Sequence, residues 1–328
     1  MSKKFTVPRD TASLSLKHVL LGGGVFDNTG EHPNKKGWDI FELGQKSFWA
    51  VPTAVDWAAP VQEDPEYAES IAAMLAFLAP GEKAAVTGAS MISLGVQSEE
   101  AKFYFVEQAL EEAKHFDALR RLIGKITGKP LGEPSPSIRL LYSFGVVDPD
   151  DVAFMMGSIN IIGEHLANQI FHQINHVAKD PTVRKVLALI GKDESRHIAA
   201  GQRFFPEVYP HFRRNRHRIM AKNLATTMVL LFAGYELVNP MRKLDIDLSK
   251  ILEAMYQHYS EVTDGLPAFP EQGVFDVLLS LLRKSTPGAV AVVHKVTGEG
   301  GQLDASKLVQ LCETAIKSPR ALREMFAA

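Results

Sequence analysis

Glu112-Ala-Lys-His115 and Glu194-Ser-Arg-His197 are the two stretches that decide the fold of this 328-residue chain. On an α-helix, side chains three residues apart lie on nearly the same face, so each Glu-x-x-His pair can point at one target. One such pair by itself is weak support for a site, because acidic and basic residues at this spacing are common on solvated helix faces. The significance of the two copies therefore depends on what precedes them.

A glutamate precedes each pair by the same interval. Glu82 lies 30 residues before Glu112 (112 − 82), and Glu164 lies 30 residues before Glu194 (194 − 164). The midpoint of each interval is an expected turn, so an antiparallel helix hairpin would bring its two glutamates level with each other. One offset of 82 residues (194 − 112) relates the two sets, which makes them an internal pseudo-repeat of six potential ligands. The two expected turns are Gln97-Ser98 and Lys179-Asp180.

The apolar pattern predicts an all-α chain. Apolar residues recur at helical spacing from Pro65 onward, without the alternation typical of strands. Two antiparallel hairpins in tandem predict a four-helix bundle with additional N- and C-terminal helices. We expect an N-terminal segment (1–60) that packs on the bundle, the bundle itself (61–240) and a C-terminal helical extension (241–328). The expected bundle helices are about 65–94, 98–123, 149–179 and 182–205; after a break at Pro206 to Pro210, further helices are expected at about 212–238, 248–262 and 274–283.

The surroundings of the glutamates indicate a buried metal site. Glu164 follows the apolar stretch 159–163 and Glu82 closely follows 75–79, and buried carboxylates are costly unless cations compensate them. A glutamate from each of two helices, with Glu-x-x-His from each of the other two, is the ligand pattern of di-iron and di-manganese bundles. Oxygen and nitrogen ligands without thiolate also suit iron or manganese. The alternative is a metal-free bundle with buried ion pairs. The predicted ligands are Glu82, Glu112, His115, Glu164, Glu194 and His197.

In these residues the chain resembles the ferritin-like superfamily, and in particular the ribonucleotide reductase small subunit and the ligand-binding oxidases related to it. The resemblance covers about residues 41–201. The matching stretches are Phe48-Trp49-Ala-Val-Pro52, Pro80-Gly81-Glu82-Lys-Ala-Ala-Val86, Glu112-Ala-Lys-His115, Ile159-Asn-Ile-Ile-Gly-Glu164 and Asp193-Glu194-Ser-Arg-His197. The resemblance implies one metal site with Glu82, Glu112 and His115 and a second with Glu164, Glu194 and His197. Glu112 would bridge the two metals, and Glu194 is a second candidate for that role.

The same resemblance implies roles for two residues outside the ligand set. Asp193 corresponds to a carboxylate that orients the opposite histidine and fixes its tautomer. Trp49 would join that relay as an electron conduit; the alternative is plain packing, because the register around Trp49 differs by one residue from that of the family. No catalytic residue beyond the metal ligands is predicted.

Three departures from the family pattern bear on the chemistry. The reductase small subunit keeps its radical tyrosine four positions after the first histidine, where this chain has Leu119. The related oxidases join a tyrosine to a valine by an ether crosslink, and those positions are Ile159 and Ala85 here. Neither the usual radical tyrosine nor the crosslink is therefore possible, which favours oxidation of an exogenous substrate.

The resemblance implies an oxygen-activating oxidase or monooxygenase that acts on a small, apolar organic molecule. Its cofactor would be two metal ions, iron–iron or manganese–iron, with O2 as co-substrate. A reductase or ferredoxin would supply electrons, and a homodimer is expected. Two other functions stay open: a radical or electron-transfer protein like the reductase small subunit, and a ferroxidase or iron-handling protein. The expected substrate pocket includes Gln108, Phe105, Phe116 and Ile159.

Composition excludes several other classes. The formal net charge of -2 gives no reason to expect a nucleic acid as partner. The single cysteine, Cys312, excludes an internal disulfide and fits a reducing compartment, so we expect a cytoplasmic protein. The apolar stretch 224–237 is too short to span a bilayer comfortably and is expected to be a buried helix.

Overall fold

The computed structural model describes residues 35–144, 152–247, 250–251, 253–254 and 257. Every regular element in these residues is helical, which confirms the predicted all-α class. The elements are α2 (Lys35–Ser47), α3 (Val51–Ala54), α4 (Pro65–Gly95), α5 (Glu99–Thr127), α6 (Pro136–Phe144), α7 (Val152–Met156), the π-helix η2 (Gly157–Gly163), α8 (Glu164–Val177) and α9 (Pro181–Lys243).

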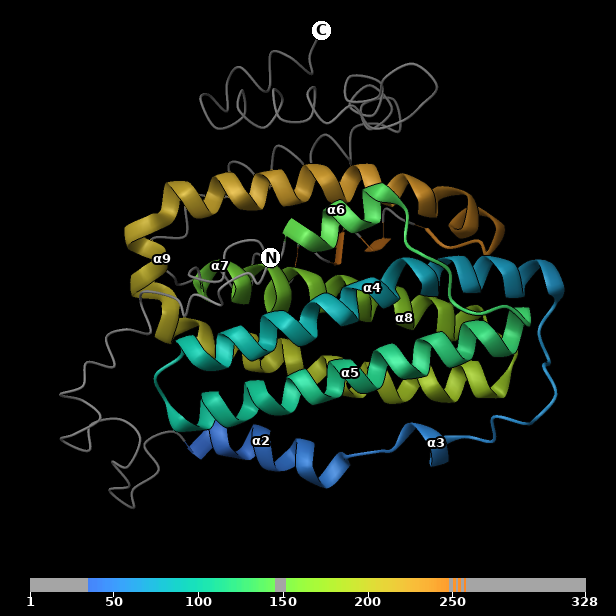
Figure 1. The fold of residues 1–328 in the computed structure, drawn as a ribbon, viewed down its shortest axis with the longest axis horizontal. Helices are drawn as coiled ribbons and strands as arrows, with labels where there is room; N and C mark the ends of the chain where they lie inside the picture. Colours follow the sequence, from blue (N-terminus) through green and yellow to red (C-terminus); the bar gives the residue numbers. More distant parts are fainter. Residues whose placement is uncertain (1–34, 145–151, 248–249, 252, 255–256, 258–328) are drawn as a thin grey trace, which may run out of the picture.

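Four long helices form the bundle that the spacing of the glutamates predicts. α4 and α5 pack side by side, and α8 packs against α9 (Figure 1). α9 also contacts α4 and α5, so the two hairpins form one bundle. α2 lies along α5, and α6, which was not expected from the sequence, packs on α4 and α9. The prediction of two helix hairpins in tandem is confirmed.

Both hairpin turns lie where the sequence predicts them. Asp180 precedes α9, and its carboxylate accepts hydrogen bonds from the backbone N–H groups of Thr182 (2.8 Å) and Val183 (3.1 Å). These N–H groups have no partner within the helix, so the side chain caps it. Ser98 precedes α5, but its hydroxyl donates to Glu207 on α9 (2.6 Å) instead of capping α5. One turn is thus held by a helix cap and the other by a contact between the hairpins.

The predicted break at Pro206 to Pro210 is wrong. α9 is one helix of 63 residues that continues through both prolines. Figure 1 shows it bending back across the bundle, so that its second part returns on the side of α6. Proline removes a backbone donor and is the usual cause of a helix bend, so we attribute the bend to these two residues. The expected helix 212–238 lies within α9, that at 274–283 lies outside the described residues, and 248–262 is described only in part.

The third bundle helix contains a π-helical segment. The expected helix 149–179 forms as one run of α7, η2 and α8, and η2 ends directly before Glu164. π-Helical segments are rare, usually lie within α-helices and are frequent at functional sites. α9 approaches η2 closely at Gly201, because a Cβ atom there would lie 2.6 Å from Cβ of Asn160. A larger residue at this crossing would push the two helices apart.

Two apolar clusters fill the bundle, and buried polar residues lie between them. On α5, Ala101, Tyr104 and Phe105 belong to one cluster and the buried apolar residues of 118–126 belong to the other. The buried polar residues of α5 fall mainly at 107–115, between these two. The polar layer is thus closed at both ends by apolar side chains. Among the described residues, no helix is both long enough and apolar enough to cross a membrane.

Candidate metal centre

The six predicted ligands converge from four helices in the polar layer of the bundle. All six residues are buried, with at most 4% of their surface exposed. They form two groups, within each of which one ligand atom per residue lies within 4.8 Å of the others. The groups are Glu82, Glu112, His115 and Glu194, and Glu112, Glu164, Glu194 and His197. Glu112 and Glu194 belong to both groups, which is the arrangement expected of bridging carboxylates.

Each imidazole turns one ring nitrogen into this cluster. Nδ1 of His115 lies 3.0 Å from Oε1 of Glu194 and 3.5 Å from Oε2 of Glu82. Nδ1 of His197 lies 3.0 Å from Oε1 of Glu112 and 3.2 Å from Oε2 of Glu194. The Nδ1 atoms are therefore the donor atoms available to a cation, and the Nε2 atoms are left for outer partners.

Each outward nitrogen meets a buried carboxylate from the other Glu-x-x-His helix. Nε2 of His115 lies 3.0 Å from Oδ2 of Asp193 on α9, and Nε2 of His197 lies 2.9 Å from Oε2 of Glu111 on α5. Such a partner fixes the ring orientation and the tautomer, which leaves Nδ1 free to bind a metal. Asp193 thus lies beside the opposite histidine, and its orienting role stays a prediction. Glu111 has the equivalent position at the second histidine and was missed by the sequence reasoning.

Two buried cations neutralise these outer acids. Arg196 donates to Oε1 of Glu111 (2.5 Å) and to Oδ1 of Asp193 (2.7 Å). Nζ of Lys114 lies 2.8 Å from Oδ2 of Asp193. Buried charges are tolerated when they are paired in this way. The pattern acid–Glu–x–base–His occurs at both histidines with the 82-residue offset, so it was the signal that could have identified Glu111.

Trp49 is hydrogen-bonded to this outer layer. Its Nε1 donates to Oδ2 of Asp193 at 2.8 Å, and its ring stacks on His115 with 6.3 Å between centroids. Nζ of Lys114 lies 4.5 Å from the centroid of the indole. The preceding residue, Phe48, is 52% exposed. A hydrogen-bonded path thus runs from Trp49, next to the surface, through Asp193 to His115.

A pair of buried amides holds two of the inner carboxylates. Nε2 of Gln108 donates to Oε1 of Glu164 (2.8 Å) and to Oε1 of Glu112 (3.2 Å). Asn160 in η2 donates in turn to Oε1 of Gln108 (2.8 Å) and to the carbonyl oxygen of His197 (3.2 Å). The π-helical segment is therefore tied to both helices that carry the Glu-x-x-His pairs.

Burial and mutual repulsion shift the carboxyl pKa values in the cluster. Burial raises the pKa of Glu82 and Glu164 well above the usual range, and the carboxylates of Glu112 and Glu194 add to this rise. Burial acts in the same direction on Glu112, but the two imidazoles outweigh it and hold the pKa of Glu112 well below its usual range. Protein groups alone therefore cannot keep all four carboxyl groups charged, whereas bound cations would.

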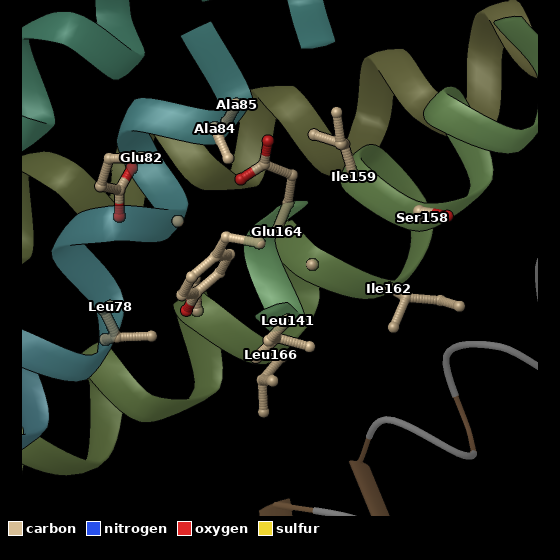
Figure 2. Close-up of a pocket in the computed structure, with 14 residues that line it drawn as sticks. Leu78, Glu82, Ala84, Ala85, Leu141, Ser158, Ile159, Ile162, Glu164 and Leu166 are labelled. Atoms are coloured by element: carbon tan, nitrogen blue, oxygen red, sulfur yellow. The ribbon is translucent and has the colours of Figure 1, made fainter. Parts of the chain in front are cut away.

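An apolar cavity of about 120 Å³ reaches the cluster. Figure 2 shows Glu82 on α4 and Glu164 on α8, the two ligands that line it. Its walls are mostly apolar and include Leu78, Leu141, Tyr142, Ile159, Ile162 and Leu166. A small molecule in this cavity would lie directly beside two of the candidate ligands.

One of the four residues expected in a substrate pocket lines this cavity, namely Ile159. Gln108 is bonded to the inner carboxylates instead, Phe105 is buried in one apolar cluster, and Phe116 packs against the other. Tyr142 lines the cavity although the sequence did not single it out, because its helix α6 was not expected. A substrate role for any of these residues stays a prediction.

Comparisons with known proteins bear on the fold. No family model and no curated protein matches the chain. A point variant of an R2-like ligand-binding oxidase with an aerobically reconstituted Mn/Fe cofactor aligns with a TM-score of 0.51 and 16% identity, over 72% of this chain and 94% of that one. An R2-like ligand-binding oxidase from Sulfolobus acidocaldarius aligns with a TM-score of 0.47 and 18% identity, over 75% of this chain and 96% of that one.

At 16% identity, the likeness to the first of these structures establishes the fold. It agrees with the helix order and with the packing of the two hairpins described above. The chain therefore has the ferritin-like helical-bundle fold of an R2-like ligand-binding oxidase, as the sequence predicted.

Proposed function

We propose that this protein is a dinuclear metal oxidoreductase that uses O2 to oxidise a small, apolar organic molecule. The buried cluster of ligand atoms is the observation that carries the proposal. Three of its atoms make no hydrogen bond of normal geometry among the described residues: Oε2 of Glu112, Nδ1 of His115 and Oε1 of Glu194, although the last two lie 3.0 Å apart. Buried polar atoms rarely lack a partner unless an ion or a functional role accounts for them. A cation bound between these residues would satisfy all three atoms.

The set of donor atoms suits iron and manganese. The charge of four carboxylates is balanced by two divalent cations, with both imidazoles neutral. Carboxylate oxygen and imidazole nitrogen without thiolate favour iron or manganese over copper(I) or an iron–sulfur cluster. Iron–iron and manganese–iron pairs both fit this set. One ion would be held by Glu82, Glu112 and His115 and the other by Glu164, Glu194 and His197, with Glu112 and Glu194 shared.

The bound ions would supply the redox chemistry with O2, and the chain supplies the positioning. Asp193 and Glu111 hold the two imidazoles in one tautomer by accepting from their Nε2 atoms. Gln108 fixes the carboxylate of Glu164 by donating to it. The apolar clusters on both sides exclude water, which strengthens the electrostatic interactions in the polar layer. Electrons from a donor protein would arrive through Trp49, whose indole is hydrogen-bonded to Asp193.

The cavity beside Glu82 and Glu164 favours an organic substrate. A single water needs about 10–15 Å³ of such space, so a cavity of about 120 Å³ with apolar walls has room for a small organic group. A ferroxidase would need no apolar cavity at this place. Leu119, at the position of the radical tyrosine, disfavours the function of the reductase small subunit. A donor of the reductase or ferredoxin type and a homodimer stay predictions.

Metal content after loading tests the proposal. Wild-type protein loaded with Fe(II), or with Fe(II) and Mn(II) together, is expected to hold two ions per chain and to consume O2. Glu112→Ala and Glu194→Ala each remove a carboxylate shared by both groups of ligand atoms, so each is expected to abolish occupancy by two ions. Glu69→Ala, which removes an exposed carboxylate from α4, is the matched control and is expected to bind like wild type.

Anomalous diffraction at the iron and manganese edges would then locate the ions. Two peaks between the six side chains support the proposal and identify the metal pair. Retention of two ions in both Glu112→Ala and Glu194→Ala would refute the assignment of the bridges. An absence of metal in loaded wild-type protein would refute the proposed function altogether.

A further inference from the structure

Tyr142 lies against α4 in the wall of the cavity beside Glu82. It is the only aromatic side chain among the described residues that line this cavity. Its hydroxyl donates to the backbone carbonyl oxygen of Phe77 at 3.0 Å. Its ring also meets the ring of Phe77 edge to face, with 6.2 Å between centroids. A hydrogen bond at its end and a ring contact at its side therefore hold the tyrosine in one orientation.

Gly81 makes this close approach of the tyrosine to α4 possible. A Cβ atom at residue 81 would lie 2.6 Å from Cε1 of Tyr142 and 2.9 Å from Cζ, so a larger residue there would force the ring to move. Gly81 lines the cavity as well, and it directly precedes the candidate ligand Glu82. The ring thus packs on the backbone of α4 next to the residue that carries a ligand.

The helix that carries Tyr142 is itself fixed to the bundle. Ser135, which precedes α6, donates to Glu236 on α9 at 2.6 Å, and Ser137 donates to the same carboxylate. Leu141, the neighbour of Tyr142, is buried in an apolar cluster. α6 contacts both α4 and α9. Because the helix and the side chain are both held, the ring forms a fixed part of the cavity wall.

The space inside this wall suits one uncharged ring. An apolar cavity of about 150 Å³ in another protein binds benzene, and the cavity here has a similar volume of about 120 Å³. Among the described residues that line it, the charged ones are Glu82 and Glu164 (Figure 2), and none is a lysine, arginine or histidine. An anionic head group would meet carboxylates and two ions that four carboxylates already balance, and burying an unpaired charge is costly.

We propose that the substrate is a compact, uncharged molecule about the size of one aromatic ring, and that Tyr142 sets this size limit. The inference rests on the proposed function, since it names the substrate class of the same site. The ring fills space between α6 and α4 that a longer molecule would need. The hydroxyl has a structural part only, because it is bonded to a backbone carbonyl oxygen.

Binding of three probes to the full chain tests the proposal without turnover. Wild-type protein, either metal-free or loaded with Fe(II) in the absence of O2, is titrated in a calorimeter with benzene, n-butylbenzene and n-octanoate. Benzene is expected to bind at least about ten-fold more tightly than each of the other two, because a misfit of one methylene group alone changes binding by about 10- to 200-fold.

Replacement of the ring is expected to reverse the order of the two aromatic probes. In Tyr142→Ala, n-butylbenzene should bind at least about ten-fold more tightly than benzene, because each methylene group that becomes buried strengthens binding about four-fold. Tyr142→Leu, which keeps an apolar side chain in the wall, should shift the order in the same direction. Tyr142→Phe keeps the ring and is the matched control, so it should retain the order of wild type. Gly81→Ala displaces the ring from α4 and should weaken binding of benzene.

Crystals soaked with bromobenzene give the position of the probe, because bromine scatters anomalously. The expected position is beside Glu82 and Glu164, and a probe bound only elsewhere would overturn the inference. Equal affinities for benzene and n-butylbenzene in wild type, or octanoate bound as tightly as benzene, would overturn the substrate class. The wild-type order in both Tyr142→Ala and Tyr142→Leu would overturn the role of Tyr142. These outcomes leave the proposed function standing, whereas failure of wild type to bind two ions or consume O2 would overturn both.

Discussion

Replacing Glu111 with alanine is expected to weaken binding of the ion at His197 while the protein still folds. The carboxylate contacts Nε2 of His197 at 2.9 Å, Arg196 at 2.5 Å and Lys114 at 3.7 Å. Both cations also contact Asp193, at 2.7 Å and 2.8 Å, so the variant leaves neither of them unpaired. The imidazole has no such second partner for its Nε2 atom among the described contacts. The main effect should therefore fall on the histidine.

The magnitudes follow from these contacts. Leaving a buried charge without any partner costs about 3–5 kcal/mol, whereas losing one hydrogen bond to a charged group costs about 1.5–3 kcal/mol. Arg196 and Lys114 stay paired with Asp193 in the variant. We therefore expect Glu111→Ala to lower the free energy of unfolding by the smaller of these amounts, about 1.5–3 kcal/mol. Loss of an outer partner of a ligating histidine weakens metal binding by about 10- to 100-fold. That corresponds to roughly 1.4–2.7 kcal/mol of binding free energy.

Metal titration against a competing chelator measures the affinities of the two ions, and urea denaturation measures the stability. Glu111→Gln is the matched control, because the amide oxygen of the glutamine can still accept from Nε2 of His197. The affinity of this variant for the ion at His197 should be within a few-fold of that of wild type. Wild-type affinity for both ions in Glu111→Ala would refute the orienting role. An equal loss of affinity for both ions in Glu111→Ala would refute the assignment of Glu111 to His197 alone.

Two further predictions concern stability. Asp180→Ala removes the acceptor of the backbone N–H groups of Gln62, Thr182 and Val183, and it is expected to lower the free energy of unfolding in urea by about 1–3 kcal/mol; a loss below about 0.5 kcal/mol would contradict the cap. Burial raises the pKa of Glu107 from 4.5 to about 7, so its contribution to stability is fully present below pH 4.5 and is lost as the pH rises through 7. Denaturation between pH 4.5 and 8 should show wild type losing stability relative to Glu107→Gln, and parallel curves would speak against the raised pKa.

The sequence predicted the parts of this protein that depend on local periodicity. The hairpin turns lie at the expected places because the apolar spacing ends there and because Asp180 is a good helix cap. The break at Pro206 to Pro210 was wrong for a physical reason. A proline in a helix costs about 3 kcal/mol or more, and packing of α9 on the rest of the bundle can outweigh that cost.

Contacts between the two hairpins could not be predicted in the same way. Helix geometry correctly places the side chain of Glu111 on a different face of α5 from that of Glu112. It does not predict that Glu111 contacts His197 on α9. Only the relative position of the two helices decides this. Tyr142 is a similar case, since α6 has to pack on α4 before the tyrosine can line the cavity.

The two Glu-x-x-His helices carry the same acid–Glu–x–base–His pattern, yet the structure gives the two patterns unequal surroundings. At one histidine the outer acid, Asp193, is bonded to Trp49, which follows an exposed residue. At the other, the outer acid, Glu111, is bonded to Arg196, which it shares with Asp193. Neither acid lines the cavity, which meets the cluster at Glu82 and Glu164, the two glutamates outside the Glu-x-x-His pairs. Electrons from a donor protein would thus arrive on the side of Trp49 and Asp193, while a substrate in the cavity would approach from the side of Glu82 and Glu164. The pseudo-repeat explains how six ligands meet; the broken symmetry around it accounts for how electrons and substrate would be kept apart.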